Sequence, residues 1–212
     1  SSLEKRNWVV QLTDSTYDLG IKPLEFGLSV LSKVELKKVA KQYLIELEDT
    51  THETACISLR LGNEEIVLDK VESRDYIRAV PSLGTKTPIW NGATGKVMLA
   101  YMNKKEVNDI LGDVLKSNDV NASPDSKKEI DNLLAQLPQI RKSGFAVSVG
   151  ERSLSGVCVA APILDHNEQV IGNISVAGPL PRFNEKVARS LGPLVKQTAK
   201  QINIKMGSKH QI

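Results

Sequence analysis

An alternating hairpin near the C-terminus constrains the fold of this 212-residue chain more than any other feature. The segments Val157–Leu164 and Gln169–Ala177 are rich in β-branched and small residues, and the turn formers Asp165-His166-Asn167-Glu168 separate them. Two such runs around a polar turn predict an antiparallel hairpin. Because a two-stranded ribbon is marginally stable alone, further strands or helices must cover it.

The pairing inside this hairpin predicts which side chains share a face. A turn centred between His166 and Asn167 places Cys158 opposite Ser175, and residues that face each other project to the same side of a sheet. Cys158, Ser175 and Ala177 should then project together, leaving room for a ligand, unless they are ordinary sheet positions under a helix. The core-facing positions are predicted to be Val157, Val159, Ile174 and Val176.

The remaining strand-like segments are short. Residues Trp8–Leu19 are predicted to form a small hairpin, and the alternation at Ala55–Leu61 followed by Ile66–Val71 predicts another. We expect a third strand at Tyr76–Val80 and a loop at Pro81–Pro88.

Helical periodicity covers much of the rest. After Gly20 two apolar stripes run through Leu24–Leu31 and Leu36–Leu47, and their phase breaks near Ser32-Lys33-Val34, which fits two helices or one bent helix. Further helices are expected at the positions Thr94–Tyr101, Lys104–Leu111, Ile130–Ile140 with a kink at Pro138, and Val187–Ile202 capped by Asn184. The stretch Gly112–Ser126 is polar, and Ser123-Pro124-Asp125 is a helix-start signal. The order predicts an α+β fold with helices packed on a central antiparallel sheet.

Composition excludes several classes of function. The net charge of +3 is too small and dispersed to indicate nucleic-acid binding by this chain alone. The two cysteines, Cys56 and Cys158, make no metal or disulfide pattern, which favours a reducing, cytoplasmic location. No apolar run approaches the roughly 20 residues of a membrane span. The charged start, without an initiating Met, suggests a trimmed chain.

The segment Pro88–Ala100 has the features of an anion-binding helix start. Small residues and two glycines lead into a helix, whose first N–H groups and positive dipole end suit an anion. A P-loop would need Gly at Trp90 and Ser or Thr at Val97, so the segment is not one. A carboxylate-sized ligand fits better than a nucleotide, and an ordinary capped helix is the alternative.

These motifs, taken in order, resemble the isocitrate lyase regulator (IclR) family of transcription factors. Singly each is weak, but the ordered set from Tyr17 onward is specific. The motifs are Tyr17-Asp18-Leu19-Gly20, Gly84-Thr85-Lys86-Thr87-Pro88, Asn91-Gly92-Ala93-Thr94-Gly95-Lys96 with Leu99-Ala100, Ile140-Arg141-Lys142-Ser143-Gly144-Phe145, Gly150-Glu151, Gly156, Ala160-Ala161-Pro162, and Ser175-Val176-Ala177-Gly178-Pro179.

The resemblance implies a winged-helix DNA-binding domain followed by a GAF-like effector-binding domain, in a homodimer or homotetramer. Residues 1–20 would be the remnant of the wing of an absent winged helix-turn-helix domain. A linker helix would follow, and residues 21–212 would form the sensor domain. Operator DNA would be bound only through the missing domain, a small organic acid would be the effector, and no membrane contact, cofactor or metal is implied.

The resemblance also implies where the effector binds. In relatives that bind small oxo-acids, the ligand is held by the turn matching Gly92 and Ala93, by a Cys matching Cys158, and by Ser residues matching Ser175 and Ala177. A carboxylate of some relatives aligns with Ser148. We also assign Ile89, Trp90 and Asn91 to the effector site, where Ile89 and Trp90 suggest a pocket entrance of different shape. Ser148 and Ala177 depart from the pattern, so a larger effector, such as a sugar acid or an aromatic acid, stays open.

The alternative is a GAF-like enzyme that uses Cys158 as a redox or nucleophilic residue. No histidine stands in an obvious partner position, because His52, His166 and His210 are scattered. The sequence therefore favours a sensor with neither catalytic residues nor a metal site, in which Glu151 orders the loop beside the pocket and Cys56 is simply packed.

Overall fold

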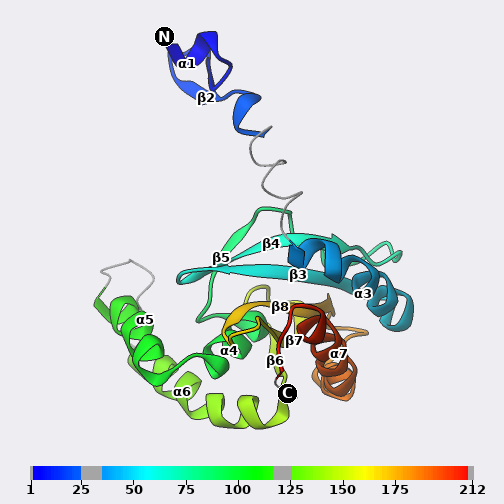
Figure 1. Cartoon of the computed structure of the whole chain (residues 1–212). Helices are drawn as coiled ribbons and strands as arrows, with labels where there is room; N and C mark the ends of the chain where they lie inside the picture. The colour runs from blue at the N-terminus through cyan, green and yellow to red at the C-terminus, as the bar shows by residue number, and fades with distance from the viewer. Residues whose placement is uncertain (1, 25–34, 117–125, 210–212) are drawn as a thin grey trace. The chain divides into compact units, whose positions relative to one another are not determined.

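The computed structural model describes residues 2–24, 35–116 and 126–209, in two compact units divided as Ser1–Lys38 and Val39–Ile212 (Figure 1). The predicted break between the first two helical stripes and the helix-start signal at Ser123-Pro124-Asp125 lie outside the described residues.

The first unit is a short helix followed by the predicted hairpin. Helix α1 (Ser2–Lys5) precedes strands β1 (Val9–Gln11) and β2 (Tyr17–Leu19), which pair antiparallel with Val10 opposite Asp18. The turn is closed by Asp14, whose Oδ1 accepts hydrogen bonds from the Thr16 N–H at 3.0 Å and hydroxyl at 2.6 Å.

The second unit is built on a six-stranded antiparallel sheet in the order β5-β4-β3-β8-β7-β6. This confirms the predicted α+β class with a central antiparallel sheet. The strands are β3 (Thr54–Leu61), β4 (Glu64–Val71), β5 (Lys86–Pro88), β6 (Ala146–Val149), β7 (Gly156–Leu164) and β8 (Val170–Pro179).

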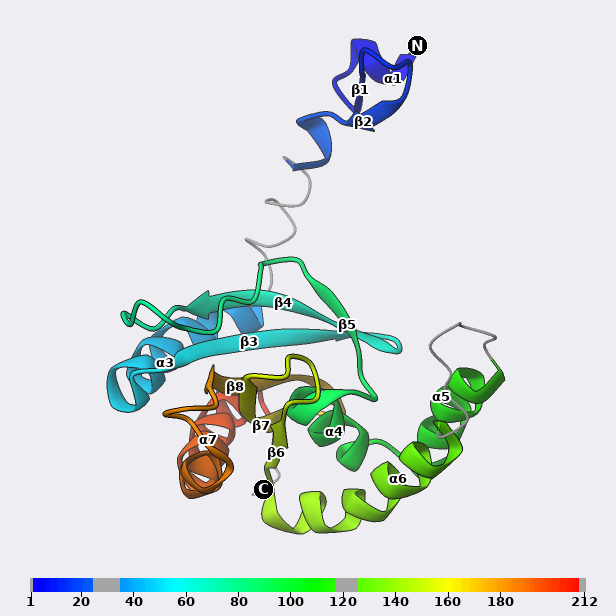
Figure 2. The ribbon, with the colours of Figure 1, turned by 180° about the vertical axis from the view of Figure 1, so that it is seen from behind.

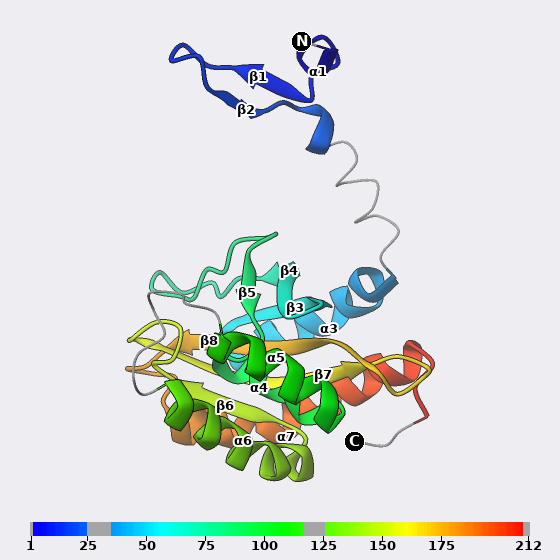
Figure 3. The same ribbon diagram turned by 90° about the vertical axis from the view of Figure 1, so that its left-hand side faces the viewer.

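Helices cover both faces of this sheet. Helices α3 and α7 lie on one side, and α4, α5 and α6 lie on the other (Figures 2 and 3). Their bounds are α3 (Glu35–Thr51), α4 (Gly92–Tyr101), α5 (Lys104–Lys116), α6 (Ser126–Ser143) and α7 (Glu185–Lys205). As predicted, the Asn184 side chain caps α7 by accepting from the Val187 N–H at 3.1 Å. Pro138 is accommodated within α6.

The register of the C-terminal hairpin differs by two residues from the prediction. Cys158 lies opposite Ala177, and Ser175 lies opposite Ala160. Leu164 lies opposite Val170, so the centre of the loop is half a residue later in the chain than predicted. A β-bulge at Ile163/Leu164 adds the rest of the two-residue shift in pairing. Because a shift of two preserves the side to which each residue points, Cys158, Ser175 and Ala177 still share a face.

Two other strand predictions were wrong. Residues Tyr76–Val80 form no strand, because Tyr76 and Ile77 are largely exposed and no strand edge pairs with them. The edge of β4 is instead taken by β5, which lies within the segment predicted as a loop. Strand β6 has only four residues and was not foreseen.

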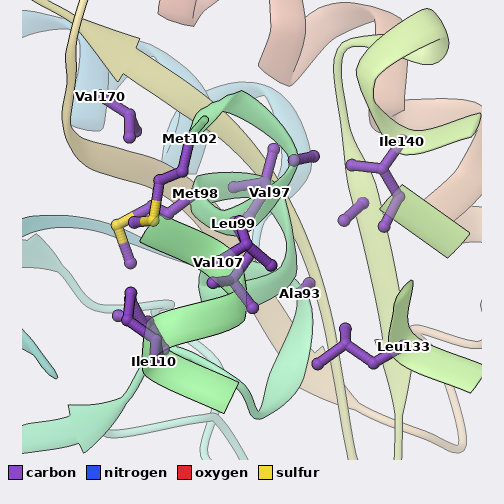
Figure 4. Packing of buried hydrophobic residues seen from close by; sticks show 14 of the residues in the cluster. Ala93, Val97, Met98, Leu99, Met102, Val107, Ile110, Leu133, Ile140 and Val170 are labelled. Atoms are coloured by element: carbon purple, nitrogen blue, oxygen red, sulfur yellow. The ribbon is translucent and has the colours of Figure 1, made fainter. Parts of the chain in front are cut away.

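The core fills both sides of the sheet. Val157, Val159, Ile174 and Val176 are at most 2% exposed, as predicted for the face that meets α7. On the other face α4 is buried along almost its whole length, and Figure 4 shows Val97, Met98 and Leu99 packed among residues of α5 and α6. In the described ranges no helix is long and apolar enough to cross a membrane.

Candidate ligand-binding site

A cavity of about 490 Å³ lies between the α4-facing side of the sheet and the loops that precede β5 and β7. Its size is in the range of pockets that bind small organic molecules. Loop residues within 77–81 and 151–155 line it along with α4 and strands β3, β4, β6, β7 and β8. The lining residues with polar side chains are Cys56, Ser58, Arg78, Thr94, Ser148, Glu151, Arg152, Ser153, Ser155, Cys158 and Ser175.

The strand register explains why small polar groups gather here. Ser148, Cys158 and Ala177 form one row across β6, β7 and β8, because Ser148 pairs with Cys158 and Cys158 pairs with Ala177. Ser175 and Cys56 belong to the next row, where they face each other across β8 and β3. Paired residues point to one side of a sheet. The rows therefore place these five side chains on one wall of the cavity.

The structure separates the sequence-predicted site residues into two groups. Those that line the cavity are Ala93, Ser148, Cys158, Ser175 and Ala177. The others lie in the segment before α4 and are not among the lining residues: Ile89, Trp90, Asn91 and Gly92. Ile89 is fully buried in the core under α4, and Trp90 packs against the same core.

The N-terminus of α4, which the sequence predicts to bind an anion, already holds a carboxylate of the protein. Oε2 of Glu151 accepts the Gly92 N–H at 3.2 Å, and Oε1 lies 2.5 Å from Lys96 Nζ. A carboxylate is favourable at a helix N-terminus because it meets unpaired N–H groups and the positive end of the dipole. The expectation that Glu151 orders the loop agrees with these contacts, although Glu151 also lines the cavity.

Arg152, next in the chain, packs over the same helix start. Its Nε and Nη2 donate to the Asn91 carbonyl at 3.1 and 2.8 Å, and Nη2 also donates to Glu65 Oε1 at 2.5 Å. A side chain at Gly92 would collide with it, since an added Cβ would lie 2.7 Å from Arg152 Nε. Gly92, at φ +79°, is thus required both by its backbone conformation and by this contact.

Glu65 is the buried counterion of Arg152. Its side chain is only 1% exposed, and it gathers hydrogen bonds from four elements of the domain. Besides Arg152, its donors are Thr94 Oγ1 at 2.6 Å, Thr87 Oγ1 at 3.1 Å and Asn173 Nδ2 at 2.5 Å. A buried carboxylate needs this kind of pairing, because desolvation otherwise disfavours its charge.

Both thiols that line the cavity are held in the protonated form. Burial raises the pKa of Cys158 to about 12, although nearby Arg152 acts in the opposite direction. Cys158 is half-buried and lines the cavity. Burial likewise raises the pKa of Cys56. Since the thiolate is the nucleophile, neither cysteine is activated, and no histidine lines the cavity.

Sequence reasoning missed several lining residues. Cys56 was expected only to be packed, and Ser58, two residues along the same strand, was not considered. Both could have been found from their alternation once the pairing of β3 with β8 was known. Arg78 and Arg152 lie in irregular segments, which carry no periodic signal. Lys86, in the segment before α4, has a side chain that is 55% exposed, with Nζ 3.5 Å from Glu64 Oε2, and it does not line the cavity.

Comparison with known proteins identifies the family to which this domain belongs. A family model described as "Bacterial transcriptional regulator IclR C-terminal" matches residues 28–204. The chain belongs to the IclR family of transcriptional regulators.

Individual relatives agree with this assignment. The chain is 28% identical over 207 residues to the HTH-type transcriptional regulator KipR of Bacillus subtilis, covering 98% of this chain and 82% of that protein. It is 26% identical over 209 residues to the HTH-type transcriptional repressor AllR of Escherichia coli, covering 95% and 76%. The crystal structure of the Thermotoga maritima IclR matches with a TM-score of 0.79 and 30% identity over 97% of this chain and 82% of that one.

These relatives are transcriptional regulators, not enzymes. That finding overturns the alternative of a GAF-like enzyme with Cys158 as its reactive residue, and the raised pKa of the Cys158 thiol agrees. In the described ranges no group of three or more histidine, cysteine, aspartate or glutamate side chains is arranged to hold a metal ion.

Proposed function

We propose that the second unit binds a small organic acid as the effector of the regulator and that the 490 Å³ cavity is the binding site. The observation that carries the proposal is the wall on which Ser148, Cys158, Ser175 and Ala177 face Ala93 of α4. Small side chains leave the volume open, and hydroxyl and thiol groups supply hydrogen bonds to a polar ligand.

The cavity favours an effector larger than a two- or three-carbon oxo-acid. Ser148 and Ala177 are small and bring no charge to the row that they share with Cys158. Serines of the loop before β7, together with Ser58 of β3, add hydroxyls at other points of the wall. Such a lining suits a hydroxylated or aromatic acid that fills the space and makes several neutral hydrogen bonds. Ile89, Trp90, Asn91 and Gly92 would then act from behind the wall, by supporting α4.

A thermal-shift screen with sugar acids, hydroxy acids and aromatic acids tests this proposal. A ligand that binds only the native state stabilises it by about 2.7 kcal/mol at a concentration of 100 times Kd. The cavity is tested by Ala177→Leu, which fills it from β8, against the matched control Ala135→Leu on the exposed surface of α6. The hit should lose its shift in Ala177→Leu alone. An equal shift in both variants, or no shift from any acid, would contradict the proposal.

We further propose that effector binding changes the affinity of the regulator for its operator. Residues 1–20 would be the last part of a winged helix-turn-helix domain, followed by a linker helix, and the working form would be a homodimer or homotetramer. The effector would shift the population of two arrangements of the protein. Anisotropy of a labelled operator, titrated with the full-length regulator with and without the acid, measures this coupling. An unchanged operator affinity would refute it.

A further inference from the structure

We propose that Arg152 binds the acid group of the effector and thereby selects acids over neutral ligands. The inference rests on the proposed function and adds to it a residue outside the set implied by the family resemblance. It follows from which of the charged groups around the cavity still have bonding capacity.

The first N–H group of α4 already binds a carboxylate of the protein. The Gly92 N–H, which begins the helix, is already bound by Glu151 at 3.2 Å. The same carboxylate is held by Lys96 at 2.5 Å, and Lys96 is 11% exposed and absent from the cavity wall. An incoming carboxylate would have to displace a charge-paired side chain of the protein to bind there.

Arg152, by contrast, lines the cavity, and its hydrogen bonds to the described residues use only two of its three nitrogens. Its Nε and Nη2 are fixed by the Asn91 carbonyl and by Glu65, whereas no acceptor for Nη1 is found among the described residues. It also lies close enough to Cys158 that its charge partly offsets the rise in the pKa of that thiol caused by burial. The charge of Arg152 is therefore near the wall formed by Ser148, Cys158, Ser175 and Ala177. A guanidinium held in this way is preorganised, so little side-chain entropy is lost when it binds a carboxylate.

The charges on the cavity wall are consistent with this role. Two guanidinium groups, those of Arg78 and Arg152, and one carboxylate, that of Glu151, line the cavity. Both oxygens of Glu151 are occupied by Lys96 and Gly92. Glu65, the counterion of Arg152, lies behind the wall, is 1% exposed and is not a lining residue. The lining therefore carries one more cation than anion, and Arg78 is paired at 3.0 Å with Glu72, which is not a lining residue. Glu65 acts as the positioning residue of Arg152.

The test compares acids with neutral analogues of matching shape. The probes are lactate with propane-1,2-diol, gluconate with glucitol, galacturonate with galactose, and mandelate with 1-phenylethane-1,2-diol, titrated calorimetrically into the protein. Replacing Arg152 alone would leave Glu65 buried without a cation. The test variant is therefore the pair Arg152→Gln with Glu65→Gln, which removes both charges and keeps hydrogen-bonding groups.

The protein offers a matched control pair outside the cavity. Arg182 Nε lies 2.6 Å from Glu53 Oε1, Glu53 is 5% exposed, and neither residue lines the cavity. The variant Arg182→Gln with Glu53→Gln removes the same two charges elsewhere. Circular dichroism and thermal melting establish that both double variants are folded before the titrations.

The expected result is a loss of roughly tenfold or more in affinity for the bound acid in the Arg152/Glu65 variant, since hydrogen bonds to charged groups are worth that factor or more. Affinity for the neutral analogue should change by less than about threefold, and the control pair should leave both unchanged. Glu65→Gln alone should leave the affinity for the acid within about threefold of the wild type, because the amide oxygen can still accept the hydrogen bond that positions Arg152.

The possible failures are distinct. If an acid binds the wild-type protein and the Arg152/Glu65 variant equally, the assignment of Arg152 is wrong and the proposed function stands. If Ala177→Leu abolishes binding of a neutral analogue while no acid binds, the cavity is a ligand site but the acid chemistry and the role of Arg152 both fail. If no probe binds, the proposed function fails together with the inference.

Discussion

Replacing Gly92 with Ala tests the most specific packing contact at the site. Gly92 has φ +79°, and an added Cβ would lie 2.7 Å from Nε and 3.2 Å from Cδ of Arg152. A left-handed conformation costs a non-glycine residue about 1–2 kcal/mol. Because Arg152 is pinned by Asn91 and Glu65, moving it aside loses at least one hydrogen bond to a charged group, which is worth about 1.5–3 kcal/mol.

Gly84→Ala is the matched control for this substitution. Gly84 has a similar φ of +77°, and an added Cβ would meet no atom within 4 Å. The control should therefore show only the backbone penalty, whereas Gly92→Ala should be less stable than the control by roughly 1.5–3 kcal/mol, the cost of the lost hydrogen bond. In a domain of this size that difference corresponds to roughly 3–12 °C in Tm.

Urea unfolding followed by circular dichroism measures both variants. The excess cost of Gly92→Ala should shrink when it is combined with the Arg152→Gln and Glu65→Gln changes, because a glutamine lacks the guanidinium that pins Arg152 to the Asn91 carbonyl and Glu65 and can move aside. Equal destabilisation by Gly92→Ala and Gly84→Ala in the wild-type background would refute the placement of Arg152 over the start of α4.

Three further predictions concern packing and charge. Gly192→Ala in α7 should lower the urea midpoint, because the new Cβ would collide with the Phe145 ring at 2.2 Å. This cost should outweigh the gain of about 1 kcal/mol in helix propensity, and a raised midpoint would contradict the prediction. The Cys158 thiol has its pKa raised to about 12, so at pH 8 it should react with iodoacetamide far more slowly in the native than in the unfolded protein, as measured by mass spectrometry. For the same reason, the stability that the neutral thiol contributes should be lost as the pH rises from about 9 towards 12. Asn173→Asp places a second carboxylate beside buried Glu65, because the Asn173 amide nitrogen now lies 2.5 Å from Glu65 Oε2. In urea unfolding this substitution should lower the free energy of unfolding by about 3 kcal/mol or more at pH 8 and by clearly less at pH 5. An equal loss at both pH values would argue against this geometry.

The parts of the fold that were predictable are those with a periodic pattern. Alternation in Val157–Leu164 and Val170–Pro179 was enough to predict the hairpin, its faces and its buried side. The register was wrong because a β-bulge at Ile163/Leu164 depends on local backbone geometry that the pattern does not encode. Tyr76–Val80 has the composition of a strand, but a strand also needs a partner edge, and β5 occupies the one beside β4.

The candidate site was predictable where it lies on strands and helix α4. Ser148, Cys158 and Ser175 were expected together, and the strand rows bring them to one wall. The charged part of the site was not predictable. Glu65 and Arg152 are 87 residues apart in the sequence, and Arg152 lies in a loop, which carries no periodic signal. The helix start was recognised as an anion site, but the occupant, Glu151, could be identified only from the folded chain.

The most direct test of the whole account is a crystal structure of the protein with the acid that gives the largest thermal shift. The account predicts that the acid lies between the sheet and α4, in contact with Cys158 and Ser175, and that its carboxylate is bound by Arg152 while Glu151 stays on the Gly92 N–H. Density for the acid outside the cavity would contradict the central claim. Density inside it with the carboxylate remote from Arg152 would contradict only the assignment of that residue.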